Sequence, residues 1–204
     1  MTLQGFAVPC ALCFALCACS TMRDVAEPVA LEDGFNTPAS DGTFPIALTS
    51  IQRGSIPGQY AYQTGFEQDV GMRVFAGLMP DAVVSGSVGG SAIFDARYQG
   101  SRTSEIAITP ATTPGGDPIL TGTSGAFSGD ITLTVDMAGT ALTGSDGLLA
   151  VNGQIDGQTL AGTVTYRGLD GSLTGLIGED EAIGAFFATS DTTIYAGGFA
   201  GKAR

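Results

Sequence analysis

The chain has 204 residues, including 31 glycines but neither tryptophan nor histidine, and its formal net charge is −12. This length is sufficient for a domain with its own core. An acidic surface repels phosphate backbones, which excludes nucleic-acid binding. Without histidine, the chain has no Ser-His-Asp or Cys-His catalysis and no ordinary histidine-based zinc site, while carboxylate chemistry and calcium binding stay open.

The first residues are predicted to direct export. Residues 3–16 form an apolar stretch that is too short to span a bilayer as a helix and is typical of a signal-peptide core. The sequence Leu16-Cys17-Ala18-Cys19 follows and resembles the lipobox of bacterial lipoproteins. That resemblance implies a signal peptide over 1–18, acylation of Cys19 with fatty acids such as palmitate, and a lipid anchor in the bacterial outer membrane.

All four cysteines lie in this first segment, at positions Cys10, Cys13, Cys17 and Cys19. Cleavage before Cys19 leaves one cysteine in the mature chain, so no internal disulfide can form. A metal or redox cluster is the alternative. It is disfavoured because neither histidine nor acidic residues accompany these cysteines within the apolar stretch.

Residues 19–57 are predicted to be a flexible tether that lifts a domain off the membrane. Prolines interrupt the segment, acidic residues keep it solvated, and no periodicity appears. Only residues 44–48, Phe-Pro-Ile-Ala-Leu, are expected to pack on the domain as a short edge segment.

From residue 60, runs of alternating apolar and small polar residues separated by glycine turns predict antiparallel strands. Within 126–135, for example, Ile131 and Leu133 fall on one face and Thr132 and Thr134 on the other, as in a strand packed on one side. The Pro- and Gly-containing stretch 109–122 is predicted to be a loop. The expected strands are 60–65, 72–77, 92–98, 105–109, 126–135, 141–143, 148–155, 159–166, 172–177, 183–188 and 193–199.

Turn chemistry supports these hairpins. Asp156-Gly157 and Asp170-Gly171 are predicted to be two-residue hairpin turns, because a type I′ turn needs positive φ at its central positions. Asp136 and Gly139 mark a further break. The sequence Gly178-Glu-Asp-Glu181 predicts a solvated acidic turn, with Gly178 taking backbone angles that other residues avoid.

We therefore expect an all-β domain over 58–204 in the form of an antiparallel eight-stranded barrel, because closure removes exposed strand edges. A transmembrane barrel is the alternative. It needs strands of about nine to eleven residues with aromatic girdles, and neither is evident here.

Three segments resemble the barrel of a family of surface lipoproteins that includes transferrin-binding protein B and the factor H binding protein. Residues 91–100 are similar to the opening barrel strand of that family, and residues 126–136 to its next strand. Residues 175–187, together with the basic terminus 198–204, resemble its closing pair. The resemblance implies a non-enzymatic binding protein at the cell surface.

Several side chains were weighed as chemical sites. The aspartates could form acid/base pairs, and Asp146-Gly147 or Asp170-Gly171 could belong to calcium loops, but surface turns are favoured for all of them. Phe186, Phe187 and Tyr195 could line a ligand pocket, although core packing is favoured, with one phenylalanine inside the barrel and the other outside. The acidic turn 179–181 could be a binding patch. The aspartates considered are Asp69, Asp81, Asp95, Asp130 and Asp146.

The sequence thus predicts a lipid-anchored envelope protein that binds a host or environmental protein or serves nutrient acquisition, such as that of iron. We expect no enzymatic activity, cofactor or metal, and no catalytic residue. A structural envelope lipoprotein without a ligand is the first alternative, and a carboxylate-dependent hydrolase is the second.

Overall fold

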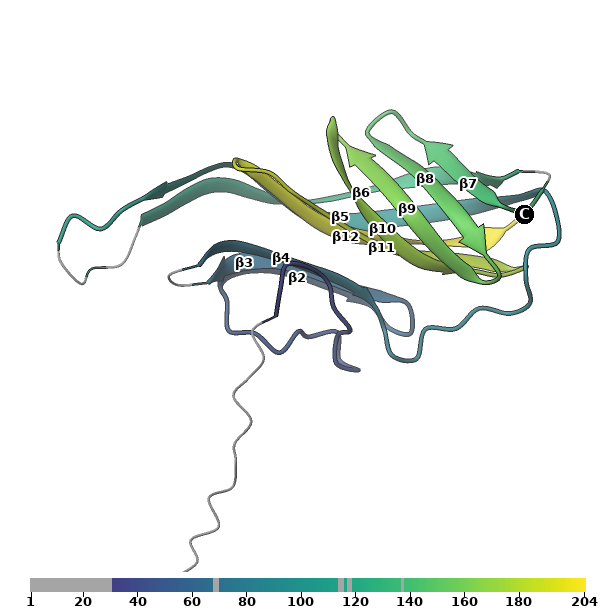
Figure 1. The fold of residues 1–204 in the computed structure, drawn as a ribbon, viewed down its shortest axis with the longest axis horizontal. Coiled ribbons are helices and arrows are strands. Elements are labelled where there is room, and N and C mark those ends of the chain that lie inside the picture. Colours follow the sequence, from purple (N-terminus) through teal and green to yellow (C-terminus); the bar gives the residue numbers. More distant parts are fainter. Residues whose placement is uncertain (1–30, 68–69, 114–115, 117–118, 137) are drawn as a thin grey trace, which may run out of the picture. The chain divides into compact units, whose positions relative to one another are not determined.

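The computed structural model describes residues 31–67, 70–113, 116, 119–136 and 138–204, which form strands and no helix (Figure 1). Consequently, no membrane-spanning helix occurs in this described part of the chain. The strands are β1 (Gly34–Phe35), β2 (Thr49–Ile56), β3 (Tyr60–Glu67), β4 (Gly71–Leu78), β5 (Ala92–Thr109), β6 (Ile119–Val135), β7 (Ala141–Ser145), β8 (Leu149–Asp156), β9 (Thr159–Tyr166), β10 (Leu169–Ile177), β11 (Glu181–Thr189) and β12 (Thr193–Ala203).

Strands β5 to β12 close into an antiparallel barrel in the order β10-β11-β12-β5-β6-β7-β8-β9. This confirms the predicted fold class of an eight-stranded antiparallel barrel. Period-two alternation fills the interior, because every second residue of each strand points inward. Ile131, Leu133 and Val135 are buried as predicted, and large aromatic side chains such as Phe94 and Phe186 are fully buried in the same cluster.

A second, four-stranded sheet of order β1-β4-β3-β2 packs on the outer wall of the barrel. Tyr60 and Val74 from this sheet form one apolar cluster with the outward-facing Ile183 and Ala185 of β11. The opposite face of the sheet is covered by Phe44 and its neighbours, which form a separate cluster with Phe75. Both faces of this sheet therefore bury apolar side chains.

These strands fall in ranges assigned above to a tether and to the barrel. Residues 49–56, expected in the tether, form β2, and the barrel begins only at Ala92. Arg73 of β4 fixes the start of the described chain by an ion pair with Asp33, at 2.7 Å, and a hydrogen bond to the Leu31 carbonyl. The part of 19–57 from residue 31 onward is thus folded, as the expected packing of 44–48 partly anticipated. Residues 19–30 lie outside the described residues, and a tether there stays a prediction.

Two predicted turns differ in detail from the structure. The β9–β10 turn consists of Arg167 and Gly168, with φ of 49° and 82°, and not of Asp170-Gly171. Gly171 lies inside β10, where a Cβ would approach the Phe187 carbonyl oxygen to 2.3 Å, so close packing rather than a turn requires glycine. In the β8–β9 hairpin, Asp156 pairs with Thr159, which makes Gly157 the first central residue.

At position 178 too, close packing rather than an unusual backbone angle requires glycine. It is not among the glycines with positive φ, and a Cβ there would lie 2.3 Å from the Ser85 carbonyl oxygen. The predicted strand 105–109 is not separate either, because it continues β5 through a bulge after Ser104. The predicted loop 109–122 is correspondingly shorter, since β6 already begins at Ile119.

Candidate functional site

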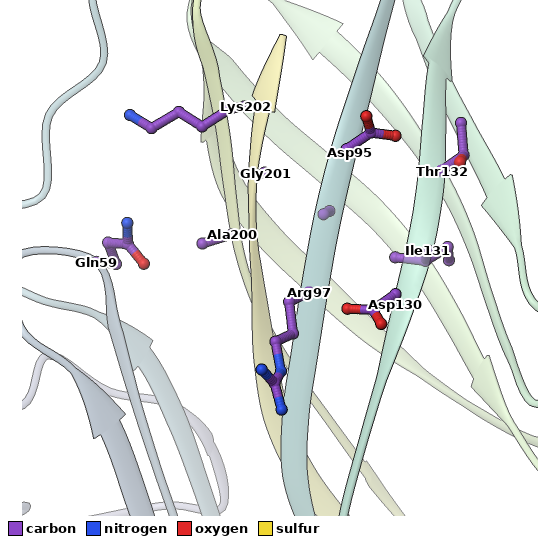
Figure 2. Close-up of a pocket in the computed structure, with 10 residues that line it drawn as sticks. Gln59, Asp95, Arg97, Asp130, Ile131, Thr132, Ala200, Gly201 and Lys202 are labelled. Atoms are coloured by element: carbon purple, nitrogen blue, oxygen red, sulfur yellow. The ribbon is translucent and has the colours of Figure 1, made fainter. Parts of the chain in front are cut away.

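A groove of about 460 Å³ lies on the outer wall of the barrel, across β12, β5 and β6. Figure 2 shows its charged side chains: Lys202 from β12, Asp95 and Arg97 from β5, and Asp130 from β6. Alternation places these side chains outside, because their neighbours Phe94, Ala96 and Ile131 point into the barrel core. Gln59, from the turn between β2 and β3, forms the opposite wall.

Ion pairs hold part of this surface in place. Arg204 donates to both carboxylate oxygens of Asp95 from Nε, each at 3.0 Å, and again from Nη2 at 2.7 Å. The hydrogen bonds from Arg204 hold the pKa of the Asp95 carboxyl below its usual value. Lys202 pairs with Glu181 of β11, its direct cross-strand neighbour. These side chains remain open to solvent, with 72% of Lys202, 62% of Asp95 and 55% of Arg204 exposed.

Two buried polar atoms lie beside the groove without a hydrogen-bond partner in the described residues: the Gln59 Oε1 and the Tyr60 hydroxyl. Tyr60 is fully buried, and its ring lies over Gly198 of β12. Burial raises the pKa of the Tyr60 hydroxyl well above its usual value, and the charge of Arg97 acts in the opposite direction. Tyr60 therefore stays neutral and serves as packing between the sheet and the barrel.

This arrangement suits ion pairing better than proton transfer. A general acid needs a carboxyl group whose pKa is raised, whereas Arg204 lowers that of Asp95. The described residues contain no group of three metal-ligating side chains. The groove can instead offer charges of both signs to an incoming surface.

The aspartates weighed above are only partly brought together. Asp95 and Asp130 share the groove and lie on strands, not on turns as expected. Asp81 lies in a turn, and Asp146 accepts hydrogen bonds from the Leu148 and Leu149 amides in the β7–β8 turn. Asp69 lies outside the described residues.

The aromatic candidates lie where core packing predicts. Phe186 is fully buried inside the barrel, and Phe187 lies outside it, 4.9 Å from Phe35 between ring centroids. Tyr195 is buried, and its hydroxyl donates to the carbonyls of Val164 and Leu169.

The remaining candidates are the acidic turn 179–181 and the cysteines. Within the predicted acidic patch, Glu179 and Asp180 are exposed, while Glu181 begins β11. Cys19 and the other cysteines lie outside the described residues, so the lipid anchor stays a prediction.

Three residues of the groove are not predicted from the sequence: Gln59, Arg97 and Lys202. The alternation of 92–98 was a usable signal, because it sets Asp95 and Arg97 opposite the apolar face. Nothing in the sequence indicated that Gln59 would approach them, since the β2–β3 turn reaches the barrel only through tertiary packing.

Neither a protein-family model nor a curated protein sequence matches this chain. Several solved structures are similar to this chain. The haemoglobin receptor HpuA of Kingella denitrificans is matched with a TM-score of 0.38 and 14% identity over 72% of this chain and 55% of that one. Transferrin-binding protein B of Haemophilus parasuis is matched with a TM-score of 0.42 and 11% identity over 75% of this chain and 36% of that one. The same protein of Neisseria meningitidis is matched with a TM-score of 0.43 and 11% identity over 78% of this chain and 36% of that one.

Transferrin-binding protein B, which three segments of the sequence resemble, is therefore among the solved structures that this chain is similar to. The chain spans about half of the length of the first of these structures and about a third of the others.

Proposed function

We propose that the chain is a non-enzymatic binding module, held at the bacterial outer membrane by a lipid on Cys19, whose barrel presents a charged groove to a protein partner. One observation carries the proposal: apolar side chains fill the barrel interior, and the charged side chains of the groove lie on its outer wall. An eight-stranded barrel packed in this way has little room for an interior ligand. Recognition therefore falls to the outer wall, where Asp130 and Arg97 meet between adjacent strands.

A protein partner fits the exposure and charge of the groove. Lys202, Asp95 and Arg204 are more than half exposed, so they can re-pair with a second surface at modest desolvation cost. The net charge of −12 favours a partner with a basic face and speeds its approach at low salt.

The binding proposal can be tested with an immobilised chain and defined partners. Transferrin and haemoglobin, for which the similar structures are named, are the first probes. We expect Asp130→Lys to weaken binding by about tenfold, as the loss of one buried charge-assisted contact would. Asp156→Lys, an equal charge change at the exposed end of β8 and outside the groove, serves as the control.

If neither probe binds, the proteins of serum and of culture fluids are the next candidates to apply to the immobilised chain. Binding that Asp130→Lys and Asp156→Lys weaken equally would show that net charge, not the groove, is responsible. Capture of no partner at micromolar concentration would count against the binding function itself.

The lipid anchor has a separate test. Acylation of Cys19 would insert hydrocarbon worth about 0.8 kcal/mol for each buried methylene group. We expect Cys19→Ala to release the protein from membranes, with Cys17→Ala as the matched control. Retention of the Cys19→Ala chain would refute the anchor without touching the binding proposal.

A further inference from the structure

One long stretch of the barrel wall lacks a neighbour on one side. β6 pairs with β5 along its whole length, from Ile119 to Val135, but β7 pairs only with residues 133–135. Turn and loop backbone hydrogen bonds in the described chain do not involve residues 119–131. These residues therefore make no backbone hydrogen bonds on the side away from β5, over a length of roughly 40 Å at about 3.3 Å per residue. Figure 1 shows β5 and β6 continuing as a pair beyond the other strands.

The usual protections of an edge strand are missing from this stretch. Exposed edges are normally blunted by lysine, proline, inward-pointing charges or a bulge. Residues 119–131, ILTGTSGAFSGDI, include one charged residue, Asp130, and no proline. The bulge in this hairpin lies on β5, after Ser104, and leaves the β6 edge continuous. The edge is thus available to a further strand.

Side chains close the barrel where backbone pairing between β6 and β7 stops. The Tyr98 hydroxyl crosses Gly129 of β6 and donates to Asp146 of the β7–β8 turn at 2.6 Å. The ring of Phe127 stacks on Tyr166 of β9 with 4.1 Å between centroids. These contacts fill the gap beside residues 127–131, so the part of the edge that is open to a further strand is residues 119–126.

A small positive hollow lies directly beside the edge. It has a volume of about 170 Å³ and is lined by Arg102, Arg167 and residues 123–127 of β6. Arg102 lies opposite Gly125 in the β5–β6 register, and a Cβ at Gly125 would meet nothing within 4 Å, so the space between is open. Arg167 lies over the Tyr166 ring at 5.7 Å.

Two arginines in one hollow are unusual for a chain with only eight lysines and arginines and a net charge of −12. Arg102 donates a hydrogen bond to the Ser104 hydroxyl at 3.1 Å, and neither arginine forms an ion pair within the described residues. The charge of this hollow is thus complementary to a carboxylate that the described chain does not supply.

We propose that residues 119–126 of β6 accept an extended strand from an acidic protein segment, with one of its carboxylates bound between Arg102 and Arg167. Backbone pairing to the edge supplies affinity, and the hollow selects an acidic side chain, since alternate residues of an added strand point to that face. This site deepens the proposed function, on which it rests, by naming one segment of the partner. The net charge of −12 favours a basic face on the partner as a whole, whereas the two arginines of the hollow select a local acidic segment of it. The test of the site needs no natural partner.

The probe is a fluorescent peptide of about nine residues that alternates threonine and valine around a central glutamate. We expect it to bind the full-length chain and to slow amide exchange along 119–126, while exchange in β2 stays unchanged. A peptide with glutamine at the centre should bind about tenfold more weakly. A third peptide, N-methylated at its central amides, should not bind, because it cannot pair with an edge.

The Arg102→Gln and Arg167→Gln double variant should reproduce the loss seen with the glutamine peptide. Arg53→Gln, an exposed arginine on β2, is the matched control. Since the peptide comparison leaves the protein unaltered, it stands even if the double variant folds poorly.

Three results would each overturn the proposal: equal binding of the glutamate and glutamine peptides, binding of the N-methylated peptide, or no binding at millimolar concentration. A dimer in sedimentation, together with slow amide exchange along 119–126 in the absence of peptide, would assign the edge to a second copy and overturn the proposal as well. Loss of peptide binding together with retained binding of a protein partner would remove the strand site and leave the proposed function intact.

Discussion

The contact between the four-stranded sheet and the barrel can be probed at Gly198. This residue faces outward from β12, and the ring of Tyr60 packs closely against it. A Cβ at Gly198 would come within 2.3 Å of the Tyr60 Cδ2 and 2.6 Å of the Gly184 carbonyl oxygen. Neither neighbour can yield easily, because Tyr60 is fully buried and Gly184 belongs to the adjacent strand β11.

The expected cost of Gly198→Ala follows from that geometry. An ordinary carbon–carbon contact is about 3.5–4.0 Å, so the ring must move by more than about 1 Å in a packed cluster. Overpacking of this kind raises the free energy of the folded state by about 1–3 kcal/mol. For a domain of this size, a loss of about 2 kcal/mol lowers the melting temperature by roughly 4–8 °C.

Gly125→Ala is the matched control, because a Cβ there meets nothing within 4 Å. Urea unfolding followed by far-ultraviolet circular dichroism suits a chain without tryptophan. We expect Gly125→Ala to leave the free energy of unfolding within about 0.5 kcal/mol of the wild type. If Gly198→Ala were as stable as Gly125→Ala, the tight seating of Tyr60 on the barrel wall would be refuted.

Three further predictions concern the barrel itself. Burial acts to raise the pKa of Asp146, but hydrogen bonds from Tyr98 and backbone amides hold it below its ordinary value of 3.8. The stabilising contribution of the ionised Asp146 is therefore present above about pH 4 and is lost as the pH falls below that value. Asp146→Asn should lower the free energy of unfolding at pH 7 by about 1 kcal/mol, and it should reduce the fall in melting temperature on acidification. Phe186→Ala, which empties a fully buried ring site, should cost about 3–5 kcal/mol in urea unfolding, and Phe187→Ala less, because Phe187 is only partly buried; equal costs would contradict the inside–outside assignment. Gly168→Ala, at φ 82°, should cost about 1 kcal/mol by the same measurement, and no loss would contradict the positive-φ turn.

Local patterns were sufficient to predict the all-β class and most strands of the barrel. Alternation such as that of Ile131, Leu133 and Val135 is a short-range consequence of strand geometry, and so is legible in the sequence. Closure into a barrel was also predictable, since a long meander of hairpins removes its edges by closing. The prediction of a turn at 170–171 was wrong because Asp-Gly is compatible both with a tight turn and with a strand position where a neighbouring strand leaves no room for a side chain.

The tertiary structure alone decided which segments meet. No local pattern predicts that the sheet containing β2, β3 and β4 packs on the outer wall of the barrel. That packing depends on contacts such as Tyr60 with Gly198, which are separated by more than half of the chain. The groove around Asp95 and Asp130 and the free edge of β6 arise in the same way. Residue type and spacing determined each strand, whereas packing between distant strands determined which charges and which backbone groups remain available to a partner.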